Sequence, residues 1–184
     1  MTTYRFYTAT SLDGFLADGH DSLDWLLSQP QEEDNLLDYD RFIEEVGVVV
    51  MGRTTYDWIV EHEGTAGEGA WPYTQPTVVL THRPLDPVAP TVRAREGAPA
   101  SLRAELEELA GAKEVWIVGG GDVAAQFAKG GMLDLIDVSI APVLLGSGRP
   151  LFTAALDLEL LETGRNAGFV EARYRVRGAG SWSA

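Results

Sequence analysis

Three consecutive glycines, Gly119 to Gly121, separate an apolar stretch from a helical pattern in the segment EVWIVGGGDVAAQF, residues 114–127. Glycine is a poor residue inside a strand or a helix, because it loses the most backbone freedom on folding. Three together indicate either that the backbone has a positive φ here or that another group approaches this backbone more closely than a Cβ atom would allow. A phosphate on the helix N-terminus, where free N–H groups and the helix dipole favour an anion, is one explanation. A tight turn without a ligand is the other.

Length and composition are typical of one globular domain. The 184 residues are expected to form a single domain, residues 1–184, that buries roughly two thirds of its unfolded surface. No stretch approaches the roughly 18 apolar residues of a membrane span. The N-terminal residues lack the pattern of a secretory signal. The absence of cysteine excludes disulfides and thiolate zinc sites within this sequence. We therefore expect a cytoplasmic protein that does not act at a membrane.

The charge of the chain bears on its partners. A formal net charge of −14 argues against nucleic acid, which binds clustered cations. The three histidines, His20, His62 and His82, stand in separate loops without ligand spacing, so we expect no metal. In so acidic a protein, any cations gathered at one place become informative.

Strand and helix patterns alternate along the chain. Strands are expected at the start of 4–17, broken at Asp13-Gly14, and at 46–52, 77–82, 91–93, 115–118, 135–145, 156–162 and 168–177. Helices are expected at 31–46, from Arg53, from an N-cap at Ser101 to about Gly111, and at 122–129. This order predicts an α/β fold, with a mostly parallel central sheet covered by helices on both faces in three layers.

Two further strand ends carry residues that suit phosphate. VVVMGRTTY is a buried strand, then Gly52, then a helix that begins with Arg53, Thr54 and Thr55. VVLTHRP ends in Thr81, His82 and Arg83. The carboxyl ends of parallel strands share one edge of a sheet, where ligands bind. Together with the three glycines, these strand ends favour a nucleotide with several phosphates.

Gly119, Gly121 and Ala124 also satisfy a dinucleotide-binding spacing, G-x-G-x-x-A, but the context of a Rossmann fold is incomplete. Only about a third of the chain follows the motif. The one acidic residue at a suitable distance, Asp137, lies inside an apolar strand. An ordinary Rossmann domain is therefore the weaker interpretation.

The motifs in their order resemble the dihydrofolate-reductase-like superfamily, and within it stand-alone relatives of the riboflavin-biosynthesis reductase C-terminal domain. The segments SLDGFLA, LDWL, VVVMGRTTYDW, VVLTHRP, VWIVGGGDVAAQF and IDVSIAPVLLGSGRPLF carry the resemblance, over about residues 4–152. It implies NADPH bound across the carboxyl edge of the sheet and hydride transfer to a small heterocycle. The bifunctional riboflavin enzymes also carry a zinc deaminase with an H-x-E and P-C-x-x-C signature, which this cysteine-free sequence lacks.

The resemblance also implies roles for individual residues at matching positions. Ala9 and Leu16 would flank the nicotinamide. Residues on the adenosine side and around its phosphates would be Gly52, Arg53 and Thr54, and those around the 2′-phosphate would be Thr81, His82 and Arg83. The pyrophosphate would lie against Gly119, Gly120, Gly121, Asp122 and Val123.

Residues for the chemical step are less defined. Folate reductases carry an acid on the helix after the DW segment that helps to protonate the pterin. Asp34, Asp38 and Asp40 are available here, and Asp38 is our choice. Trp25 would border the substrate. Asp122 beside a pyrophosphate would have to point away, as a helix N-cap.

Two functions follow from these expectations. The first is an NADPH-dependent reductase of a pyrimidine-, pterin- or flavin-precursor-like substrate. The second is a non-catalytic dimeric nucleotide-binding or interaction protein on the same fold, since no proton donor is unambiguous. Relatives are often dimers, so we expect a homodimer, paired through the apolar strand at 135–145. Arg149, in GSGRPLF, would be either a surface residue or a contact to a substrate anion.

Overall fold

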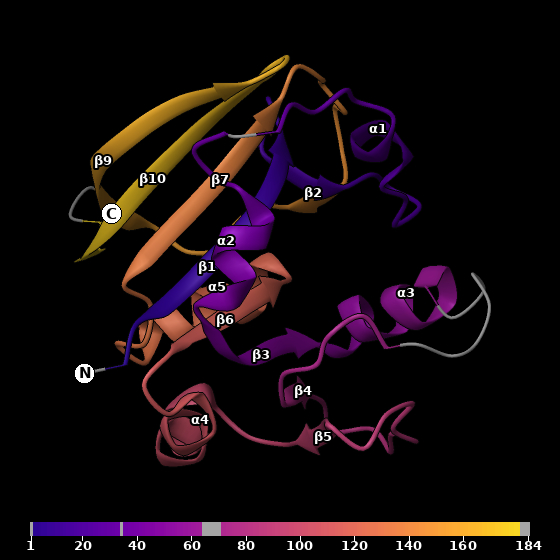
Figure 1. Cartoon of the computed structure of the whole chain (residues 1–184), viewed down its shortest axis with the longest axis vertical. Coiled ribbons are helices and arrows are strands. Elements are labelled where there is room, and N and C mark those ends of the chain that lie inside the picture. Colours follow the sequence, from indigo (N-terminus) through magenta and orange to yellow (C-terminus); the bar gives the residue numbers. More distant parts are fainter. Residues whose placement is uncertain (1, 34, 64–70, 181–184) are drawn as a thin grey trace.

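Eight strands form the central sheet of the computed structural model, in the order β5-β4-β3-β6-β1-β7-β10-β9 (Figure 1). The structure describes residues 2–33, 35–63 and 71–180. The first six strands in that order are parallel, and β10 and β9 continue the sheet as an antiparallel hairpin. The strands are β1 Tyr4–Ser11, β3 Val46–Gly52, β4 Thr77–Leu80, β5 Val92–Arg95, β6 Glu114–Gly119, β7 Leu135–Ala141, β9 Leu156–Asn166 and β10 Phe169–Ala179. A separate two-stranded sheet pairs β2 Phe15–Ala17 with β8 Arg149–Pro150.

Side chains alternate between the two faces of the sheet and form two cores. In β3, Val48 and Val50 belong to one buried cluster, and Val49 and Met51 belong to the other. This period of two follows from the pleat of a strand. Because both faces are buried, the strand reads in sequence as a continuous apolar run, as parallel strands do.

Helices cover both of these faces. The helices are α1 Asp24–Leu27, α2 Tyr39–Glu44, α3 Arg53–Glu63, a 3₁₀ turn at Pro99–Leu102, α4 Arg103–Ala110 and α5 Gly121–Lys129. Leu106 of α4 and Phe127 of α5 pack in the first cluster, and Phe42 of α2 and Ile59 of α3 pack in the second. The predicted three-layered α/β fold with a mostly parallel sheet is therefore confirmed.

The helix expected at 31–46 is wrong in its first half. Among the described residues of this range, only Tyr39–Glu44 is helical, and Asp38 caps it by accepting a 2.7 Å hydrogen bond from the Arg41 N–H. Upstream, the Leu37 N–H donates to the Glu171 carboxylate, and the Leu37 carbonyl accepts from the Tyr7 hydroxyl. These tertiary partners satisfy an N–H and a carbonyl group that would otherwise pair within a helix. Leu37 is therefore held by bonds to β1 and β10, although the spacing of the apolar residues suits a helix.

Two other expectations need correction. Ser101 does not cap α4: it lies in the 3₁₀ turn, its hydroxyl donates to the Ala98 carbonyl, and Leu102 holds the N-cap position. The strand expected at 135–145 ends at Ala141, and it pairs with β1 on one side and β10 on the other. Its hydrogen-bonding groups are thus used within the chain, and β7 cannot join a second copy by strand pairing.

No helix in the described part of the chain is long and apolar enough to cross a membrane.

Candidate functional site

A cavity of about 1070 Å³ lies at the carboxyl edge of the parallel strands. Its wall includes residues at or after the ends of β3, β4 and β6, together with β1, β2 and β8. Of the predicted cofactor residues, all but Arg83 line it: Ala9, Leu16, Gly52, Arg53, Thr54, Thr81, His82, Gly119, Gly120, Gly121, Asp122 and Val123. Strand ends far apart in sequence thus meet in one wall, as a parallel sheet requires.

The three glycines between β6 and α5 have different neighbours, and none of them has a positive φ. A Cβ atom on Gly121 would lie 2.4 Å from the carbonyl oxygen of Leu151 and 2.5 Å from that of Pro150. A Cβ atom on Gly119 would lie 3.2 Å from the Thr55 hydroxyl. On Gly120 it would meet nothing within 4 Å, since this residue faces the open cavity. Gly121 is therefore required by packing, and Gly120 leaves space for a ligand.

Helix α5 begins at this opening. Gly120 is its N-cap residue and provides no side-chain hydrogen bond. The first N–H groups of a helix have no partner within the helix, and the dipole makes this end favourable for an anion. The open space at Gly120 and the uncapped turn fit a diphosphate.

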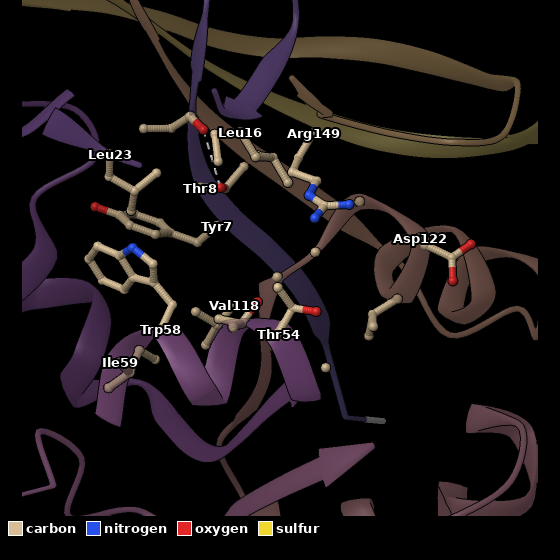
Figure 2. Close-up of a pocket in the computed structure, with 18 of the residues that line it drawn as sticks. Tyr7, Thr8, Leu16, Leu23, Thr54, Trp58, Ile59, Val118, Asp122 and Arg149 are labelled. Atoms are coloured by element: carbon tan, nitrogen blue, oxygen red, sulfur yellow. Dashed lines mark hydrogen bonds between the residues drawn. The ribbon is translucent and has the colours of Figure 1, made fainter. Parts of the chain in front are cut away.

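The junction between β3 and α3 lies beside it. A Cβ atom on Gly52 would be 3.1 Å from a methyl group of Val123, so the two junctions are in close contact. Arg53 forms a 2.6 Å ion pair with Asp57 and donates to the Pro84 carbonyl at 2.8 Å. Arg53 and Thr54 both line the cavity, and Figure 2 shows Thr54 there, whereas Asp57 and Pro84, the partners of the guanidinium, do not line it.

At the end of β4, Thr81 and His82 line the cavity, but Arg83 does not. The Arg83 N–H donates to the Thr81 hydroxyl at 3.0 Å, and its guanidinium is 3.9 Å from Asp57. That side chain is 57% exposed. Arg83 is therefore adjacent to His82 in sequence but is not part of the cavity wall.

Three other predictions are not supported by the geometry. Asp38 does not line the cavity; it caps α2 and borders a smaller hollow of about 240 Å³. Trp25 does not line it either, although its neighbours Leu23 and Leu26 do. Asp122 lies in the first turn of α5 and is not its N-cap, which is Gly120. The Asp122 carboxylate accepts a 2.7 Å hydrogen bond from the side chain of Gln126.

Two groups of wall residues were missed or left undecided by sequence reasoning. Arg149 of β8 lines the cavity (Figure 2). It forms a bidentate ion pair with Asp21, at 2.5 and 2.9 Å. This pair lowers the pKa of Asp21, chiefly through the hydrogen bond from Arg149. The leucines around α1 also line the wall. The segment LDWLL, residues 23–27, is apolar, but its sequence does not indicate which side of the fold it faces.

Asp13 fixes the loop between β1 and β2, which positions Leu16. Its carboxylate accepts from the Ser11 hydroxyl at 2.7 Å and from the backbone N–H groups of Gly146 and Leu145 at 2.7 and 3.1 Å. The Ser11 bond and then these backbone bonds lower the pKa of Asp13 to about 2. The loops at 12–14 and 143–146 are tied together by this one side chain.

Asp13→Asn is expected to destabilise the protein in a pH-dependent way. A lowered folded-state pKa contributes stability above the unfolded value of about 3.9, and this is lost as pH falls through about 2. Urea unfolding of the two proteins should therefore differ at pH 6 and converge near pH 2. Asp24→Asn, on exposed α1, is the control. A difference that persists unchanged at pH 2 would contradict the assigned role.

The strand order and the cavity at the carboxyl edge define the class: this is a dihydrofolate-reductase-like α/β fold. Residues 3–167 match the family model of the RibD C-terminal domain, and the chain belongs to that family. Two proteins of Bacillus subtilis (strain 168) are similar, and both are uncharacterized. YwjB is 35% identical over 148 residues, 79% of this chain and 80% of YwjB. YyaP is 24% identical over 185 residues, 92% and 93% of the two chains.

Solved structures share the fold. A protein assigned to riboflavin biosynthesis from Shewanella sp. PV-4 is 27% identical with a TM-score of 0.79, and the match covers 96% of this chain and 99% of that one. A pyrimidine reductase-like protein from Corynebacterium diphtheriae shares the fold at 17% identity and a TM-score of 0.61, over 95% and 92%. A diaminohydroxyphosphoribosylaminopyrimidine deaminase/5-amino-6-(5-phosphoribosylamino)uracil reductase from Thermotoga maritima shares it at 14% and 0.66, over 95% of this chain and 56% of that longer chain.

Proposed function

We propose that this chain is an NADPH-dependent reductase of a small heterocyclic substrate of the pyrimidine, pterin or flavin-precursor kind. The observation that carries the proposal is the open space at Gly120 beside the uncapped start of α5, with Arg53 and Thr54 in the same wall. This combination suits a dinucleotide diphosphate. Membership of a reductase-domain family supports the same conclusion.

The residues present would divide the work as follows. Gly120 and the first turn of α5 would hold the diphosphate, and Arg53 and His82 would lie toward the adenosine phosphates. Ala9 and Leu16 would flank the nicotinamide. Bound NADPH would supply a hydride to an electron-poor ring carbon of the substrate, and a proton would go to the adjacent ring atom. Because Asp38 lies outside the cavity, we assign the proton to water.

Arg53→Ala should weaken NADPH binding about tenfold, through loss of a charged hydrogen-bond donor in the wall. Arg83→Ala is the matched control, because Arg83 directly follows the lining residue His82 in sequence but does not itself line the cavity. Its effect should stay below about threefold. The measurement is NADPH oxidation with pyrimidine, pterin and flavin-like acceptors, read as KM for NADPH. A larger loss in Arg83→Ala than in Arg53→Ala would contradict this expectation and favour Arg83 at the 2′-phosphate, as the resemblance implies.

The alternative, a non-catalytic nucleotide-binding protein, is favoured by one observation: the acid chosen as proton donor does not line the cavity. NADPH binding without turnover of any acceptor would select this alternative. A homodimer is also proposed, and light scattering would test it. Since β7 is paired on both sides, such a dimer would use another surface.

A further inference from the structure

The two ends of the cavity differ in chemistry. In Figure 2, Tyr7, Leu23, Trp58 and Ile59 gather on one side, and Arg149 and Asp122 lie on the other. The glycines before α5 lie on this second side, because they lead into the first turn of α5, which carries Asp122. We call the first side the apolar end, defined by Tyr7, Leu23, Leu26, Leu27, Trp58 and Ile59.

In the described part of the chain, the leucines at this end are not buried by other residues. No residue of α1 is buried, although Leu26 and Leu27 belong to it and Leu23 precedes it directly. Leu27 is 65% exposed and borders the cavity. A helical turn normally places its leucines in a core. Here they line the cavity together with the rings of Tyr7 and Trp58, so a flat ring bound against them would remove apolar surface from water.

Among the described lining residues, no arginine or lysine belongs to the apolar end. The charged side chains that line the described part of the cavity are Asp21, Arg53, Glu96, Asp122 and Arg149. Arg149 lies at the other end in Figure 2, and Arg53 follows Gly52 at the junction that contacts Val123 of α5. The wall therefore carries more acid than base.

Tyr7 adds no charge to the apolar end. Its hydroxyl donates to the Leu37 carbonyl at 2.5 Å, and burial raises the pKa of the phenol. A phosphate placed here would lose its water without gaining a bidentate partner, which is the unfavourable case for a buried ion.

We propose that the substrate of this chain is an uncharged, flat ring compound without a phosphate group. The inference rests on the proposed function, because it takes the apolar end, away from the diphosphate site at Gly120, as the place of the substrate. It separates this chain from the Thermotoga maritima protein, whose name specifies a phosphoribosyl substrate. Relatives of one fold can thus differ in whether the substrate is phosphorylated.

The test compares two probes that differ only in the phosphate, 1-naphthol and 1-naphthyl phosphate. Equilibrium dialysis is done with the whole chain and saturating NADP⁺, whose own binding is measured separately by fluorescence. The phosphate ester should bind at least about tenfold more weakly than naphthol. Equal or tighter binding of the ester, or no binding of naphthol, would overturn the inference. Failure of the proposed function would appear instead as absence of NADP⁺ binding, with the preference for naphthol retained.

A variant locates the effect at the apolar end. Leu27→Arg places a cation among the α1 leucines and should improve binding of the phosphate ester about tenfold. Leu144→Arg is the matched control, since Leu144 is 69% exposed and does not line the cavity. Both positions are exposed, so neither variant should fail to fold. If Leu27→Arg and Leu144→Arg change ester binding equally, the ring does not bind at the apolar end.

Discussion

Gly121→Ala is expected to destabilise the protein by about 3 kcal/mol, because the new methyl group meets two backbone carbonyls. The same clash is expected to abolish NADPH binding at the cavity. Those oxygens, of Pro150 and Leu151, lie 2.5 and 2.4 Å from the Cβ position and cannot rotate away as a side chain would. Alanine is otherwise the better helix former by about 1 kcal/mol, so the clash has to exceed that gain. Urea unfolding followed by tryptophan fluorescence measures the difference.

Gly120→Ala is the matched control, one residue away. Its methyl group meets no atom within 4 Å, and the backbone φ of −86° is open to alanine. Stability should change by less than about 1 kcal/mol, whereas NADPH binding should weaken at least about tenfold because the methyl takes the space assigned to the diphosphate. Unchanged NADPH affinity in a folded Gly120→Ala protein would mean that this glycine serves the turn alone.

Asp137→Asn is expected to lower the free energy of unfolding by about 3–5 kcal/mol, because it removes the buried negative charge that two arginines share. The Asp137 carboxylate is 1% exposed, 2.7 Å from Arg5 and 3.0 Å from Arg173. Arg5 retains Glu114 after the change, and Arg173 retains a 3.5 Å contact with Glu162. These remaining pairs place the expected loss nearer the lower limit.

Glu159→Gln provides the comparison for Asp137→Asn on the same sheet. Glu159 pairs with Arg175 and Arg177 at 2.9 and 2.8 Å, but those arginine side chains are 53% and 57% exposed. Solvent screening limits such pairs to about 1 kcal/mol or less. The free energy of unfolding of both variants, measured in urea, should differ by more than about 2 kcal/mol. Equal losses would mean that burial does not set the strength of these ion pairs.

Much of the architecture could be predicted from the sequence, because its signals are local. The continuous apolar run of β3 followed by Gly52, and the glycines before α5, indicate strand-to-helix junctions whatever the rest of the chain does. A parallel sheet then brings those junctions to one edge. The residues at these junctions lie together for this reason.

The parts that were missed depend on tertiary partners. The segment before α2 has helical spacing, yet its backbone bonds to Tyr7 and Glu171, about 30 and 134 residues away in sequence. Arg149 enters the cavity only because β8 pairs with β2. Glycine position alone likewise gives no distinction between Gly120, which faces the cavity, and Gly121, which faces the backbone of 150–151. None of these contacts has a signature within a short window of sequence.

The most direct test of the central claim is a calorimetric titration of the whole chain with NADPH, alongside NADH. The account predicts one binding site per chain, tighter for NADPH than for NADH, and lost progressively as salt screens the diphosphate contacts. Absence of binding by either dinucleotide would contradict it, and the glycines between β6 and α5 would then serve packing and turn geometry alone.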